Sequence, residues 1–77
     1  MERKIILKNF GKNVKIARIR QDLTQENLAE IMNVSQNYVA SIEEGRANMS
    51  LVKICELAGI LNIEVTSLLE NIIRTRS

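Results

Sequence analysis

Apolar residues recur along this chain at helical spacing, in short segments separated by polar residues of the kind found at turns and helix starts. The pattern predicts five helices, over about residues 8–21, 25–32, 36–44, 51–61 and 65–74. The positions expected to face inward on the first four are Phe10, Val14, Ala17, Leu28, Ala29, Met32, Val39, Ile42, Leu51, Ile54, Cys55, Ala58 and Leu61. At this spacing Cys55 is expected to be a small buried hydrophobe rather than a reactive thiol.

Composition supports an all-α fold. The chain has no Pro, only three Gly and 3% aromatic residues, and Leu, Ile, Val and Ala dominate its apolar residues. No domain boundary, repeat or low-complexity tract interrupts the pattern, so we expect one domain over residues 1–77. A core of this size is marginal unless it is well packed or shared with a partner.

The segment from residue 24 to residue 45 predicts two short helices joined by a tight turn. Thr24 and Ser35 are residue types that cap helix N-termini. Asn33 stands where the chain must turn, and Asn tolerates the left-handed backbone conformation. Gly45 follows as a C-terminal stop, and Asp22 is expected to end the preceding helix in the same way.

The outward face of the second of these helices carries short polar side chains. They are Gln36, Asn37 and Ser41, with Tyr38 beside them. Gln and Asn each present a donor and an acceptor side by side, which matches the edge of a base in the DNA major groove. A helix-turn-helix with such a face predicts a reader of double-stranded DNA. Tyr38 contacts a phosphate or a thymine methyl, or only shields the turn; the sequence leaves both open.

This segment resembles the helix-turn-helix domain of the XRE and lambdoid phage Cro/repressor family. The matching residues are Phe10-Gly11, Arg18, Thr24-Gln25-Glu26-Asn27-Leu28-Ala29, Asn33-Val34-Ser35-Gln36, Val39, Ile42-Glu43, Gly45, Ser50-Leu51, Ile54, Ala58, Leu61 and Leu68. The resemblance covers about residues 8 to 70 and implies a compact five-helix bundle of the lambda repressor-like kind. It also implies that Arg18 pairs with Glu43 beneath the reading helix, and that Gln25 binds phosphate and braces Gln36.

Charge is unevenly distributed. Residues 1–24 carry a net charge of +5, residues 25–45 carry −4, and residues 46–77 carry +1. An acidic reading segment is unfavourable beside a polyanion, so the attraction must come from the flanks. The expected phosphate contacts are Gln25, Arg46, Lys12, Lys15 and Asn48. The alternative for the basic residues is a solvated surface without a partner. Glu44 either accepts from a cytosine amine, repels the DNA backbone or is solvated surface, of which the last is favoured.

Several apolar residues exceed what a monomer core needs. Leu68, Leu69, Ile72 and Ile73 follow an i, i+1, i+4, i+5 pattern, of which Leu68 and Ile72 are expected to face inward. The other two, with Ile60, Ile63 and Val65, predict a homodimer interface on the C-terminal helix and the end of the helix before it. The alternative is that they complete the monomer core. Ile16, Ile19 and Ile31 are also surplus, and the pattern assigns them no role.

Other functional classes find little support. The chain has no His, one Cys and no Gly-rich phosphate loop, so no enzyme activity, metal site or cofactor is expected. The apolar runs are too short for a membrane span or a signal peptide, and the lone Cys is typical of a cytoplasmic protein. No sensor domain follows the reading segment, so no small-molecule effector is implied.

The predicted function is a transcriptional regulator that binds a palindromic operator as a homodimer. A chain reduced to a reading module and a dimer contact resembles phage Cro-type repressors and the controller proteins of restriction–modification systems. The sequence leaves open which of these roles applies, and whether the protein represses or activates. The alternative is an antitoxin-type module that binds a partner protein as well as DNA, although no long tail is present to wrap a toxin.

Overall fold

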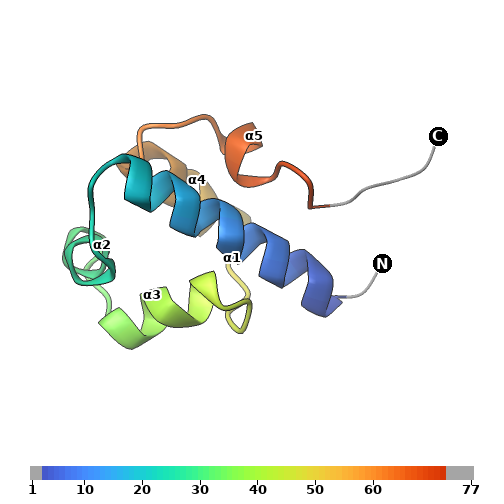
Figure 1. Cartoon of the computed structure of the whole chain (residues 1–77), viewed down its shortest axis with the longest axis horizontal. Helices are drawn as coiled ribbons and strands as arrows, with labels where there is room; N and C mark the ends of the chain where they lie inside the picture. The colour runs from blue at the N-terminus through green and yellow to red at the C-terminus, as the bar shows by residue number, and fades with distance from the viewer. Residues whose placement is uncertain (1–2, 73–77) are drawn as a thin grey trace.

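The computed structural model describes residues 3–72, and it folds them into five helices with no strand in that range. The helices are α1 (Arg3–Arg20), α2 (Gln25–Met32), α3 (Gln36–Glu43), α4 (Leu51–Ile60) and α5 (Val65–Leu68). The long α1 runs through the middle of the molecule, with α3 along one side and α5 along the other (Figure 1). The all-α class and the five-helix arrangement predicted from the sequence are thus confirmed.

The helix-turn-helix is held by hydrogen bonds at its caps. The hydroxyl of Thr24 accepts from the backbone N–H of Asn27 at 2.9 Å, and the amide oxygen of Asn27 accepts from the backbone N–H of Thr24 at 3.1 Å. The hydroxyl of Ser35 accepts from the backbone N–H of Tyr38 at 3.1 Å and starts α3. Asn33 ends α2 in the left-handed conformation, with φ 59°. These caps satisfy backbone groups that a short helix would otherwise leave unpaired, and they locate the turn.

The core is formed by side chains from all five helices. Its fully buried members are Val14, Leu28, Val39, Ile42, Leu57, Leu61 and Leu68, so every helix contributes, with Leu61 directly after α4. Burial of these side chains supplies most of the stability of a domain this small, because helices of eight residues do not persist alone.

Two expectations about α1 and α4 are wrong. α1 begins at Arg3, about five residues before the expected start. On α4, Leu51 and Cys55 were expected to face inward but are exposed, and Leu57 is buried in their place. Seven of the ten residues of α4 are apolar, so the pattern of apolar positions did not single out one face.

The fifth helix is much shorter than expected. It ends at Leu68, whereas the sequence predicted a helix to residue 74. The side-chain amide of Asn13, on α1, donates to the backbone carbonyls of Leu68 at 2.8 Å and Glu70 at 2.7 Å. The chain then turns through Asn71, whose φ is 60°. Ile72 is still buried, as expected, because the turn brings it back onto the core.

Candidate nucleic-acid interface

α3 presents two distinct faces. Val39 and Ile42 are buried beneath it, while Gln36 and Asn37 are exposed in its first turn. Ser41 and Tyr38 are half-buried at the edges of the outer face. The four side chains expected to read bases therefore lie on or beside the solvent side of one short helix. Within residues 3–72, nothing covers Gln36 or Asn37.

A buried ion pair fixes α3 to α1. Arg18 donates from Nε to Oε2 of Glu43 at 2.7 Å and from Nη2 to Oε1 at 3.1 Å. Only 10% of the Arg18 side chain and 2% of the Glu43 side chain are exposed. Arg18 also donates from Nη1 to the backbone carbonyl of Leu23 at 2.7 Å. Two parallel bonds between planar groups restrict rotation as well as distance, so the pair sets the orientation of the reading helix.

Gln25 joins this pair. Its side-chain amide donates to Oε1 of Glu43 at 3.0 Å. The sequence placed Gln25 against a phosphate and against Gln36, whereas here its amide nitrogen contacts the buried carboxylate. Gln25 therefore connects α2 to α3 and α1, and these three helices share one polar network. We name the network formed by Arg18, Glu43 and Gln25 the clamp.

The two acidic residues at the end of α3 are both paired. Glu43 is neutralised within the clamp, and Glu44 forms an ion pair with Arg46. Arg46 also lies 3.4 Å from the hydroxyl of Ser41 through Nη2. The side chains of Glu44 and Arg46 are 55% and 63% exposed, so this outer pair can open toward solvent or a ligand. Pairing reduces the repulsion that the acidic sequence of this segment predicted.

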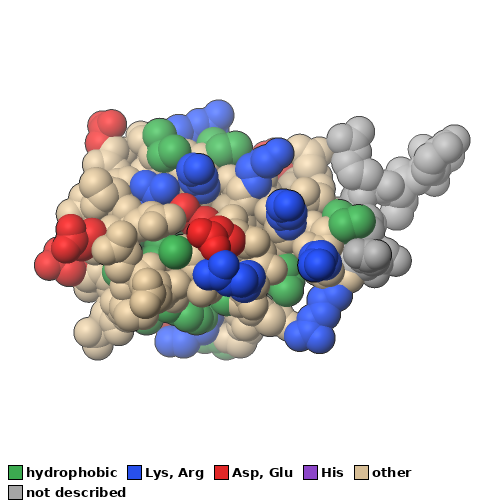
Figure 2. Space-filling view, turned by 60° about the horizontal axis from the view of Figure 1, so that its bottom comes forward, with side chains coloured by type: hydrophobic (Ala, Val, Ile, Leu, Met, Phe, Trp, Pro, Cys, Tyr) green, Lys and Arg blue, Asp and Glu red, His purple; other side chains and the backbone are tan. Residues whose placement is uncertain are grey.

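A row of lysines follows the outer side of α1. Its members are Lys4, Lys8, Lys12 and Lys15, which are all exposed and spaced by four, four and three residues. We name this row the lysine row. Figure 2, which brings the α3 side toward the viewer, shows basic side chains spread over this face, and acidic ones both at the end where α2 lies and in the middle of the face.

The lysine row begins before the residues that the sequence singled out. Lys12 and Lys15 were expected to contact phosphate, but Lys4 and Lys8 were missed because α1 was expected to start at about residue 8. A Cβ built on Gly45 would lie 2.8 Å from Cα of Lys8, which places Lys8 beside the end of α3. The i, i+4 spacing of Lys4, Lys8 and Lys12 is the sequence signal that would have indicated one shared helix face. Asn48, the remaining expected phosphate contact, is exposed in the segment between α3 and α4.

Gly11 is a further residue whose role the sequence did not reveal. A Cβ at this position would lie 2.3 Å from the carbonyl oxygen of Ile42 and 2.5 Å from that of Glu43. No side chain fits at these distances, so Gly11 allows α3 to approach the backbone of α1 directly. The close approach brings Glu43 within reach of Arg18.

The residues expected at a dimer interface differ in their exposure. Ile60, Ile63 and Val65 are half-buried against the core, and Ile73 lies outside the described residues. Leu69 is 42% exposed and shares a hollow with Ile54, while Ile63 lines a different hollow.

Other apolar side chains are more exposed than these. Leu51 and Val52, on α4, are 68% and 66% exposed. The surplus residues Ile16, Ile19 and Ile31 are also on the surface, at 43%, 53% and 55%.

Residues 3–72 contain no group of three or more His, Cys, Asp or Glu side chains that could hold a metal ion. Within the same range, no helix has the length and apolar character required to cross a bilayer.

Residues 14–68 match the helix-turn-helix family. The chain belongs to this family. It is 41% identical over 58 residues to the immunity repressor protein of Bacillus phage phi105, in a match that covers 75% of this chain and 40% of the repressor. It is 33% identical over 64 residues to the control protein C.MunI of a Mycoplasma species, covering 82% of this chain and 86% of that protein.

A solved structure of a similar protein supports the same family. The restriction–modification controller protein C.AhdI of Aeromonas hydrophila superposes with a TM-score of 0.74 and 39% identity, over 80% of this chain and 94% of that one. The XRE-type helix-turn-helix class predicted from the sequence is therefore confirmed. This helix-turn-helix protein is a DNA-binding transcriptional regulator, and its family is one of regulators rather than enzymes.

Proposed function

We propose that the protein binds a palindromic operator as a homodimer and regulates transcription from it. α3 enters the major groove, where Gln36, Asn37 and Ser41 contact base edges and Tyr38 contacts the neighbouring backbone or a thymine methyl. The observation that carries this proposal is the exposed polar face of α3 above the clamp. Reading requires donors and acceptors held in one orientation, and the clamp supplies that orientation.

The lysine row and the ends of the motif provide the sequence-independent part of binding. Lys12 and Lys15, extended by Lys4 and Lys8, would follow one strand of the backbone beside α3. The N-terminus of α2, at Gln25, adds backbone N–H groups that suit a phosphate. Arg46 and Asn48 would contact the backbone after the reading helix. Binding should therefore weaken steeply as salt is raised.

The homodimer is proposed to form through α4 and the turn after α5. Leu51, Val52 and Cys55 lie on the outward side of α4, and Leu69 shares a hollow with Ile54 of the same helix. Burial of this apolar face would offset the cost of association. This face replaces the longer C-terminal helix that the sequence predicted, and it keeps Leu69 as a member.

A two-fold axis at this face would place the two copies of α3 on one side of the duplex. Recognition helices of such dimers enter successive major grooves about 34 Å apart, so half-site centres would lie about 10 bp apart. Joining two weak half-site contacts at high effective concentration gives the affinity that one small domain lacks.

Selection of bound sequences from a random duplex pool tests the proposal. A consensus of two inverted half-sites with centres about 10 bp apart is expected. A single asymmetric half-site would contradict the homodimer, and the absence of any enriched sequence would contradict sequence-specific reading. A Gln36→Ala variant in the same selection should lose preference at one base pair in each half-site, which links the consensus to α3.

A further inference from the structure

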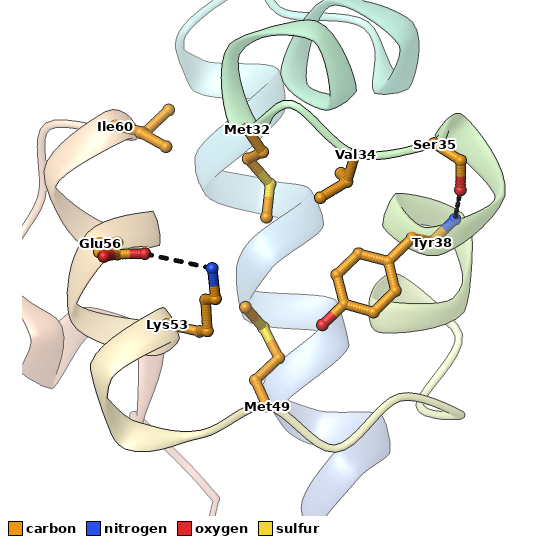
Figure 3. Close-up of a pocket in the computed structure, with 8 residues that line it drawn as sticks. All are labelled: Met32, Val34, Ser35, Tyr38, Met49, Lys53, Glu56 and Ile60. Carbon is orange, nitrogen blue, oxygen red and sulfur yellow. Dashed lines mark hydrogen bonds and ion pairs between the residues drawn. The ribbon is translucent and has the colours of Figure 1, made fainter.

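A hollow of about 400 Å³ opens between α4 and the turn that precedes α3. Its walls come from three parts of the helix-turn-helix and its surroundings: the end of α2, the first turn of α3, and α4 with the segment before it (Figure 3). The lining residues are Met32, Val34, Ser35, Tyr38, Met49, Lys53, Glu56 and Ile60. We name this hollow the turn pocket. None of the residues proposed to form the dimer face lines it.

The turn pocket is lined by apolar side chains and by polar ones from two sides, Lys53 and Glu56 on α4 and Ser35 and Tyr38 at the start of α3. Met32, Val34 and Ile60 form an apolar wall, and Met49 closes the opposite end. Figure 3 shows the ammonium group of Lys53 on the α4 side, beside Glu56, and the hydroxyl of Tyr38 across the pocket on the α3 side. The cap at Ser35 uses the backbone N–H of Tyr38 and not its phenol, so the hydroxyl is not committed to the cap.

We propose that the turn pocket binds a small molecule that has an apolar body and one anionic group. Pockets that take small ligands have volumes of about 300–1,000 Å³ and combine apolar walls with a few convergent polar groups. The flexible side chains of Met32 and Met49 can adjust to the shape of that body. The anionic group would lie between the Lys53 ammonium and the Tyr38 hydroxyl.

Lys53 is available for this role. Its ammonium lies 3.7 Å from a carboxylate oxygen of Glu56, and the two side chains are 65% and 60% exposed. An exposed pair at this distance contributes little, so a bound anion can displace Glu56 at small cost. A second charge-assisted bond from the Tyr38 hydroxyl would favour an anionic ligand over a neutral one of the same shape.

Occupation of the turn pocket would reduce DNA binding. Val34, Ser35 and Tyr38 form the turn and the start of α3, and Tyr38 is proposed to contact DNA. A ligand that holds Tyr38 removes this contact, and its negative charge lies close to where a phosphate backbone would pass. This regulatory step rests on the proposed function, whereas ligand binding itself does not.

Ligand binding is tested on the full chain without DNA, by nuclear magnetic resonance of the ¹⁵N-labelled protein. Indole-3-acetate is the anionic probe, and indole-3-ethanol is the neutral probe with the same aromatic body. Both should shift the amides of Val34, Tyr38 and Lys53, and the anion should bind at least about five-fold more tightly. Shifts confined to Leu51 and Val52, or no saturable shift, would overturn the proposal.

Two variants separate the pocket from a general attraction to anions. Lys53→Gln should remove the preference for indole-3-acetate over indole-3-ethanol, whereas Lys4→Gln, on the far end of α1, should preserve it. Met32→Trp should fill the hollow and abolish the shifts from both probes, with helical content checked by circular dichroism. Equal loss of preference in both lysine variants would overturn the proposal. Shifts of the same amides when the protein alone is diluted would also overturn the proposal, because they would indicate that a second copy of the chain occupies the pocket.

The regulatory step is tested by fluorescence anisotropy on the selected operator. Saturating indole-3-acetate should weaken operator binding by about five-fold or more, and indole-3-ethanol should have a smaller effect. The Met32→Trp variant should bind DNA without responding to either probe. Ligand binding without any change in operator affinity would overturn the coupling alone. Failure of the protein to bind any DNA would overturn the proposed function and leave the resonance result standing.

Discussion

Arg18 and Glu43 make two side-by-side hydrogen bonds, at 2.7 and 3.1 Å, in a part of the molecule where both side chains are buried. The pair joins residues that lie 25 positions apart in the sequence. Removal of one partner of this pair should destabilise the fold strongly, because a buried charge without a partner carries a large desolvation cost.

Glu43→Ala should lower the free energy of unfolding by about 3–5 kcal/mol, because Arg18 stays buried without its carboxylate. For a domain of this size the melting temperature should fall by more than about 12 °C. Glu44→Ala is the matched control, since Glu44 is the adjacent residue in an exposed pair, and its loss should cost about 1 kcal/mol or less. Thermal unfolding followed by circular dichroism measures both variants. Equal melting temperatures for the two would contradict a structural role for the clamp.

Gly11→Ala should destabilise the fold, because its new methyl group would meet the carbonyl oxygens of Ile42 and Glu43 at 2.3 and 2.5 Å. α3 must then move away from α1, which also stretches the clamp. Gly59→Ala is the matched control on α4, where nothing lies within 4 Å of the added carbon. That change should stabilise the protein by roughly 0.5–1 kcal/mol, since Ala is the better helix former. Urea unfolding of the two variants should therefore shift the midpoint in opposite directions.

Gln36→Ala should weaken binding to the selected operator by about 1–3 kcal/mol and relax the preference at one position in each half-site. Its binding to random duplex should change little, because the side chain is expected to contact a base rather than the backbone. Thr66→Ala, an exposed change on α5, serves as the control and should bind both duplexes as the unmodified protein does. The idea is refuted by an equal loss on operator and random DNA.

Lys8→Gln should weaken binding to operator and random duplex by the same factor. Removing one phosphate contact should also reduce the slope of log affinity against log salt by about 1. Arg20→Gln removes one positive charge from the same helix, but Arg20 lines a hollow with Asn13 and Ser67, away from the lysine row. Titrations at several salt concentrations should show an unchanged slope for Arg20→Gln. A shared change in slope would indicate a general effect of net charge.

Val52→Glu and Leu69→Glu should each give folded monomers that lose operator affinity. A charged side chain in the proposed apolar face has no partner there and opposes its burial. Ile31→Glu is the control, because Ile31 is a similarly exposed apolar residue on α2, outside that face. Sedimentation velocity should find dimers for the unmodified protein and for the control. A dimeric Val52→Glu variant together with a monomeric Ile31→Glu variant would move the interface to α2.

Much of the reading motif follows from local chemistry. Thr24, Ser35 and Asn33 were expected to cap and turn the chain, and they do so through hydrogen bonds that span at most four residues. Asp22 adopts the left-handed conformation expected at the end of α1, with φ 58°. Signals of this kind need no knowledge of the rest of the molecule, which is why the sequence located the two helices to within about one residue.

The C-terminal segment shows where such reasoning fails. The pattern of Leu68, Leu69 and Ile72 is typical of a continuing helix, in which the carbonyl of Leu68 would accept from the backbone N–H of Ile72. That carbonyl accepts from Asn13 instead, and Asn13 is 55 positions away in the sequence. A local pattern carries no information about so distant a donor. The proposed dimer face changed for the same reason, because the expected interface depended on a continuous helix.

The crossing of α1 and α3 divides the eight residues of the reading helix into two groups. Val39, Ile42 and Glu43 face the core and the clamp, whereas Gln36 and Asn37 contact neither. Substitutions of the outer residues should therefore change the free energy of unfolding little. The operator preference of such a protein can then change during evolution without earlier stabilising mutations. In such a protein, divergence of the operator preference is limited by the need for the operator sequence and the outer residues of α3 to change together.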